Sequence, residues 1–145
     1  MTTDPVASDL GSAPGRDRDR LLRRSLNLDA VASGGLGLLL AAAGTLLDEP
    51  LGIPSSALVP VGVFLVAYAA ALWFVGSRPR VSRPAVWVVV VGNLLWVAAS
   101  VVAAIAGWWS PTAVGTAFVL AQAAAVALFA ELQFTGLRQA RVEMA

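Results

Sequence analysis

Four long apolar runs, separated by short polar segments, constrain the fold of this 145-residue chain more than any other feature. They cover residues 30–47, 57–76, 85–107 and 112–131. Each run is close to the ~20 residues with which a helix crosses ~30 Å of hydrocarbon. In lipid, backbone amides must be paired within the segment, so a run of this length is a helix. The sequence therefore predicts an all-α integral membrane protein, a bundle of four helices.

The composition agrees with a lipid environment. Hydrophobic residues make up 58% of the chain and charged residues only 13%, which lies outside the range of ordinary soluble domains. Between Glu49 and Glu131 the only charged side chains are Arg78, Arg80 and Arg83. The rest of that stretch is suited to hydrocarbon, and the bilayer itself is the first partner that the sequence predicts.

The boundaries of the runs carry helix start and stop residues. Residues 48–50 end the first run, and Ser110 and Pro111 are predicted at the N-cap and first helical position of the fourth helix. Trp108 and Trp109 close the third run, where indole rings favour the headgroup region. Because the connections are short, we expect consecutive helices to be antiparallel neighbours.

The arginines predict the orientation. All ten basic residues are arginines, and they fall before the first run, between the second and third runs, and after the fourth run. The two other connections contain none. Because basic residues are retained on the cytoplasmic side, we expect both termini to be cytoplasmic, in the inner (plasma) membrane of a bacterium. The groups are Arg16, Arg18, Arg20, Arg23 and Arg24; Arg78, Arg80 and Arg83; and Arg138 and Arg141.

The domain organisation follows from the same pattern. Residues 1–25 are polar and lack an aromatic side chain, so we expect a disordered cytoplasmic tail. Within it, residues 16–26 are interpreted either as a solvated basic flank or as a short turn on anionic headgroups. Residues 26–138 form the predicted transmembrane domain, and residues 139–145 a second cytoplasmic tail.

Three polar side chains share one depth. Tyr68, Asn93 and Gln122 each lie eight or nine residues from the cytoplasmic end of their run, or ~12 to 14 Å at ~1.5 Å per residue. Ser100 shares a helical stripe with Asn93, and Gln133 shares one with Gln122. These stripes are expected to face the interior of the bundle.

Two interpretations of this polar level remain. Tyr68, Asn93, Ser100 and Gln122 either line a small intramembrane polar site or form interhelical hydrogen bonds. The second is favoured, since neutral side chains satisfy one another. In particular, Asn93 and Gln122 are expected to hydrogen-bond across the bundle.

Two carboxylates lie at the predicted cytoplasmic boundary of the membrane. Asp29 is interpreted as an early acidic residue of the first helix, favourable for the helix dipole. Glu131 lies on the opposite side of its helix from Gln122 and is interpreted as an interfacial anchor.

Small residues recur at a spacing of four in the first run. A ladder of this kind lets two helix backbones approach closely, and we expect the partner to be another helix of the same chain. The ladder comprises Ser33, Gly37, Ala41 and Thr45.

Several function classes lack their usual residues. The chain has no His and no Cys, so catalytic, cofactor-binding and metal sites built on imidazole or thiolate are not expected. The arginines flank membrane spans, which gives no indication of nucleic-acid binding. We therefore expect a protein that is not an enzyme and carries no cofactor.

The segments at residues 27–31 (NLDAV), 92–97 (GNLLWV), 109–112 (WSPT) and 132–138 (LQFTGLR) carry a resemblance. With them, the chain resembles a group of small four-helix bacterial inner-membrane proteins with no assigned activity. The resemblance spans about residues 26–138 and implies a multi-pass helical protein.

Three functional hypotheses follow. The first is a non-enzymatic subunit or accessory and regulatory membrane protein, with other membrane proteins or a second copy of the chain as partners. The second is a small transporter or channel-like protein that uses Tyr68, Asn93 and Gln122. The third, a membrane enzyme acting on lipid, has no residues to nominate.

Overall fold

Each apolar run lies within one helix of the computed structural model, which describes the backbone of residues 14–142 and the side chains of residues 20–138. The helices are α1 (Pro14–Leu51), α2 (Ser55–Ser77), α3 (Arg83–Ala106) and α4 (Ala113–Val142). All four are long and apolar enough to cross a membrane. The predicted all-α, four-helix architecture is confirmed, and it fits a multi-pass membrane protein.

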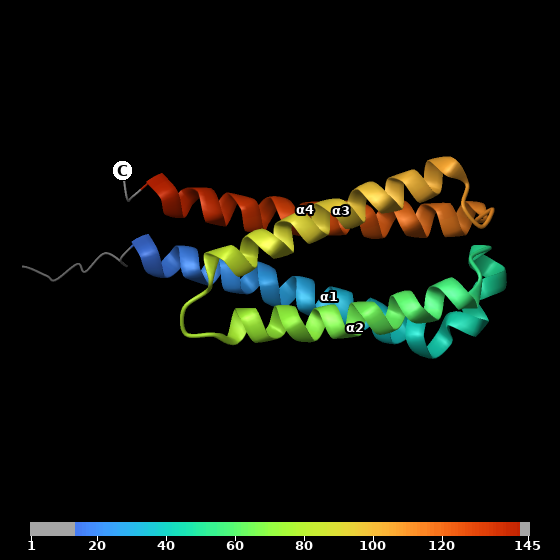
Figure 1. The fold of residues 1–145 in the computed structure, drawn as a ribbon, viewed down its shortest axis with the longest axis horizontal. Helices are drawn as coiled ribbons and strands as arrows, with labels where there is room; N and C mark the ends of the chain where they lie inside the picture. The colour runs from blue at the N-terminus through green and yellow to red at the C-terminus, as the bar shows by residue number, and fades with distance from the viewer. Residues whose placement is uncertain (1–13, 143–145) are drawn as a thin grey trace, which may run out of the picture.

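The helices run lengthwise beside one another. The N-terminal end of α1 and the C-terminal end of α4 lie at the same end of the molecule (Figure 1). The α2–α3 connection lies at this end as well. We call it the arginine end, because it carries Arg20, Arg23 and Arg24, Arg78, Arg80 and Arg83, and Arg138. The arginine-free connections α1–α2 and α3–α4 share the opposite end.

The first helix begins earlier than the sequence indicated. Residues 14–25 were expected within a disordered tail, but they belong to α1. Leu22 and Leu26 are buried, and the guanidinium of Arg23 donates to the carbonyl oxygens of Gly76 at 3.2 Å and Pro79 at 2.5 Å. One stripe of this polar stretch therefore packs into the bundle, which offsets the entropy of ordering it. Residues 1–13 of the expected tail lie outside the described residues.

The last helix also extends past its predicted limit. The fourth run was expected to end at residue 131 and a tail to begin at residue 139, but the helical backbone continues to Val142. Gln133 and Leu137 are buried on the extension. The helix continues past residue 131 because the apolar residues there recur with the helical period. Only one face of the extension needs apolar contacts, so the other face can be polar. Residues 143–145 lie outside the described residues.

α1 and α2 form the closest pair in the bundle. A Cβ atom at Gly37 would lie 2.8 Å from the backbone oxygen of Gly62 and 2.8 Å from the backbone nitrogen of Val66. A Cβ atom at Gly62 would lie 2.4 Å from the backbone nitrogen of Ala41. The glycines therefore bring the two backbones into contact, which confirms that the small-residue ladder packs against a helix of the same chain.

Consecutive helices are not all neighbours. α1 packs against α2 and α4, and α3 packs against α4, whereas the backbones of α2 and α3 come close at few points and the two helices meet through side chains. Figure 1 shows α3 running obliquely away from α2 beyond their connection. The expectation that short connections make all consecutive helices neighbours is therefore wrong for α2 and α3. A short loop fixes where two helices start, but their crossing angles are decided by packing against α1 and α4.

The start of α4 also differs from the prediction. Trp109 and Ser110 have left-handed backbones with φ of 63° and 54°, so Ser110 does not act as the N-cap. Instead, the hydroxyl oxygen of Thr112 accepts from the backbone N–H of Gly115 at 3.0 Å, and its hydrogen goes to the carbonyl oxygen of Pro50 at 2.7 Å. Thr112 thereby caps α4 and ties the two arginine-free connections together.

Two apolar clusters fill the interior. One lies toward the arginine end and includes Leu26, Leu72 and Val86, and the other lies toward the opposite end and includes Leu40 and Leu58. Of the polar side chains described next, Tyr68 packs against the first cluster and Trp96 against the second.

Candidate functional site

The polar side chains predicted from the sequence fall into two separate hydrogen-bonded groups. Tyr68 and Asn93 belong to the group nearer the arginine end, and Ser100 and Gln122 belong to the other. Asn93 bonds to Asp29, Gln133 and Tyr68 but not to Gln122, so the predicted Asn93–Gln122 hydrogen bond is wrong. The shared depth of these side chains indicated that they are hydrogen-bonded within the bundle, but it did not identify their hydrogen-bond partners.

The first group centres on a carboxylate. Asp29 Oδ1 accepts from the hydroxyl of Ser33 at 3.0 Å, and Asp29 Oδ2 accepts from Asn93 Nδ2 and Gln133 Nε2, both at 3.0 Å. The hydroxyl of Tyr68 donates to Asn93 Oδ1 at 2.8 Å. Asn93 Nδ2 also donates to Gln133 Oε1 at 3.3 Å. We call these five residues the Asp29 cluster; they come from all four helices.

The position of Asp29 corrects the sequence interpretation. It was expected early in the first helix, but its side chain is 0% exposed and lies about four turns from the start of α1. A helix dipole acts over the first turn only, so the predicted dipole role is wrong. All hydrogen-bond partners of the carboxylate are neutral. In a membrane protein, an acidic side chain buried within the helix bundle is a strong indication of a functional site.

Gln133 was not nominated, although its 0% exposure makes it one of the most buried polar residues. It lies on the same stripe of α4 as Gln122, three turns closer to the arginine end. That shared stripe was the signal that could have found it. Glu131, in contrast, is exposed and outside both groups, in keeping with its predicted place on the far side of α4.

The second group joins α3 to α4. Trp96 Nε1 donates to Gln122 Oε1 at 2.7 Å, and Gln122 Nε2 donates to the hydroxyl oxygen of Ser100 at 3.0 Å and to the carbonyl oxygen of Val119 at 2.9 Å. We call Trp96, Ser100 and Gln122 the Gln122 cluster. Trp96 was not among the polar candidates nominated from the sequence.

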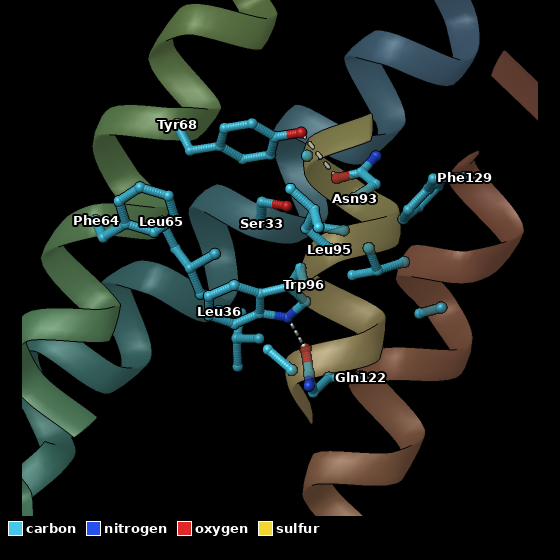
Figure 2. A pocket seen from close by; sticks show the side chains of 15 residues that line it. Ser33, Leu36, Phe64, Leu65, Tyr68, Asn93, Leu95, Trp96, Gln122 and Phe129 are labelled. Atoms are coloured by element: carbon cyan, nitrogen blue, oxygen red, sulfur yellow. Dashed lines mark hydrogen bonds between the residues drawn. The ribbon is translucent and has the colours of Figure 1, made fainter. Parts of the chain in front are cut away.

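A cavity of about 350 Å³ lies between the two clusters. Figure 2 shows Ser33, Tyr68 and Asn93 on one side of it and Trp96 and Gln122 on the other. Phe64 and Leu95, from α2 and α3, line the cavity and are 55% and 66% exposed, so it opens sideways between these two helices. Of the four residues nominated from the sequence, Tyr68, Asn93 and Gln122 line this cavity, and Ser100 lines the adjoining one.

That second cavity, of about 230 Å³, continues toward the arginine-free end. It shares Leu36, Leu65, Trp96, Ala99 and Gln122 with the first cavity and reaches Trp108 and Trp109. We call the two together the lateral groove. One end is polar and the remainder is almost wholly apolar, which is the layout expected of a site for an amphiphilic molecule.

Other classes of site find no support in residues 20–138. Within that range, no group of three or more acidic, His or Cys side chains is arranged to hold a metal ion. No protein-family model, curated protein or solved structure matches the chain, so the resemblance described from the sequence stays a prediction.

Proposed function

We propose that this chain is a non-enzymatic multi-pass membrane protein that takes up a single-chain amphiphile from the lipid phase into the lateral groove. In this proposal it serves as an accessory or regulatory protein whose state depends on that ligand. The observation that carries the proposal is the groove itself, which opens between the two consecutive helices whose backbones come close at few points.

The dimensions of the groove favour a chain-like ligand. From Asn93 to Ala103 it follows α3 for ~15 Å at ~1.5 Å per residue. A partner helix ~10 Å across and ~30 Å long occupies on the order of 2,000 Å³, far more than the cavities of about 350 and 230 Å³. An extended alkyl chain with a small polar head fits this shape, and the lateral opening faces the phase in which such molecules dissolve.

The non-enzymatic part of the proposal is supported by the residues of the groove. They include hydroxyls and amides, but the chain has no His or Cys to activate a hydroxyl or serve as a nucleophile. Other membrane proteins or a second copy of the chain are the proposed partners, and the sequence indicates no nucleic acid.

A small transporter is the second candidate, and the buried Asp29 is the observation that favours it. Ionisable residues within membrane bundles mark substrate and ion pathways in many transporters. This alternative requires water to reach the polar end of the groove. Labelling of a cysteine at Asn93 by a water-soluble thiol reagent separates it from a binding protein whose groove opens only to lipid.

The groove proposal is tested with a matched pair of glycines. A Cβ atom at Gly92, which lines the groove, or at Gly35, which does not, would meet nothing within 4 Å. Gly92→Leu places a side chain at the groove, where it would crowd the ligand. A steric cost of ~1 to 3 kcal/mol to the bound state should lower ligand binding about tenfold. The measurement is photolabelling in nanodiscs by an alkyl alcohol bearing a diazirine, in competition with the unlabelled alcohol.

Gly35→Leu is the control, because it adds the same side chain on α1 away from the groove. It should leave competable labelling unchanged. Labelling that excess alcohol does not reduce, or that falls equally in both variants, would contradict a specific groove.

We also propose that the arginine end is cytoplasmic, on the basis of the distribution of arginines alone. A reporter active only outside the cytoplasm should be active when fused after Glu49 or Trp109 and silent after Arg80 or Ala145. We expect clear reporter activity at the first two positions and only background activity at the other two. Activity after Arg80 would overturn the orientation, because three arginines would then lie in a translocated loop.

A further inference from the structure

The polar end of the lateral groove is backed by a buried acidic side chain. Ser33, Tyr68 and Asn93 line the groove, and behind them the carboxylate of Asp29 is 0% exposed. Its partners within the Asp29 cluster are neutral. A carboxylate among neutral partners is stabilised by a nearby cation, so this end of the groove favours a positively charged group.

The hydrogen-bond directions give the same polarity. The hydroxyl of Ser33 donates its hydrogen to Asp29, and the hydroxyl of Tyr68 donates its hydrogen to Asn93, which in turn donates to Asp29. A hydroxyl has one hydrogen to donate and two lone pairs. Both hydroxyls at the groove have used their hydrogen toward the cluster, so they offer only acceptors to a ligand.

The aromatic lining suits a cation as well. Phe64 stacks on Tyr68 at 6.2 Å and on Trp96 at 6.1 Å between ring centroids, and these three rings and Phe129 line the first cavity. Cations are attracted to the faces of such rings, most strongly where water is excluded. In Figure 2 the ring of Phe64 lies on the same side of the cavity as Tyr68, and the ring of Trp96 lies below them, next to Gln122.

From these three observations we infer that the ligand of the lateral groove is a primary alkylammonium amphiphile. Its ammonium group donates to the hydroxyl oxygens of Ser33 and Tyr68 under the field of Asp29, and its alkyl chain extends past Trp96 toward the arginine-free end. This inference rests on the proposed function, since it names the ligand class of the same groove.

The test compares three competitors with the same alkyl chain: an amine, an alcohol and a sulfate. Each displaces the diazirine alcohol from the protein in phosphatidylcholine nanodiscs. The amine should compete at about tenfold lower concentration than the alcohol, and the sulfate should be the weakest. In Asp29→Asn, amine and alcohol should compete within about twofold of each other, because the charge is gone and the size is kept.

A second variant covers the case in which Asp29→Asn does not fold. Tyr68→Phe removes one acceptor at the groove and leaves the ring. The ammonium group has three N–H donors and a charge, whereas the alcohol has one O–H donor, so amine binding should weaken more than alcohol binding and the preference for amine should shrink. The ranking of the three competitors on the unmodified protein decides the matter independently of either variant.

The outcomes separate the two proposals. Equal competition by amine and alcohol, or an amine preference that persists in Asp29→Asn, overturns the inference about charge but leaves the groove standing. Failure of all three competitors overturns the groove and the inference together. An amine preference that disappears with the carboxylate supports both.

Discussion

Asn93→Ala is expected to lower the free energy of unfolding by about 2 to 3 kcal/mol. The substitution removes a donor from the buried carboxylate of Asp29 and leaves the hydroxyl of Tyr68 without its acceptor. Both groups lie where water is scarce, so the loss of a partner costs more than the hydrogen bond itself contributes. Reversible unfolding of the purified protein in detergent measures the change.

Double-mutant cycles test whether the two clusters are separate. Asn93→Ala and Gln133→Ala share Asp29 and bond to each other, so their effects should couple by about 0.5 kcal/mol or more. Asn93→Ala and Gln122→Ala have no common partner and should add within about 0.5 kcal/mol. Strong coupling in the second cycle would restore the direct contact that the sequence had suggested.

Gly37→Leu is expected to be the most destabilising change on α1, by about 3 kcal/mol. A Cβ atom at this position would already lie 2.8 Å from backbone atoms of Gly62 and Val66, so the larger side chain must push α1 and α2 apart. Backbone atoms, unlike the ends of side chains, have no alternative rotamer. Thermal unfolding in detergent should show a clear drop in midpoint.

Two controls accompany this variant. Gly35→Leu makes the same change on the same helix where nothing lies within 4 Å, and Leu39→Ala removes a side chain that is 50% exposed. Both should change stability by less than about 1 kcal/mol, since lipid or detergent replaces the lost contacts. If all three variants unfolded alike, the close approach of α1 and α2 would be refuted.

Most of the candidate site was visible in the sequence as single residues but not as an arrangement. Tyr68, Asn93 and Gln122 stood out because polar side chains are rare in apolar runs, and each is hydrogen-bonded in the bundle. Asp29 was misplaced because the first run was taken to begin at residue 30. The helix begins at Pro14, and a one-sided stripe of leucines carries it into the bundle where average hydropathy is low.

The sequence by itself determined that this chain forms four helices of membrane-spanning length, because backbone pairing in lipid and the length of an apolar run are local properties. Tertiary structure decided the rest. The contact through Gly37 and Gly62 sets how α1 and α2 cross, and packing against α4 turns α3 away from α2. The resulting orientations of the helices determine which polar groups are in contact. They bring Gln133 to Asp29 and leave the lateral groove open. Helix rotation depends on side chains distant in the sequence, so no local pattern could specify it.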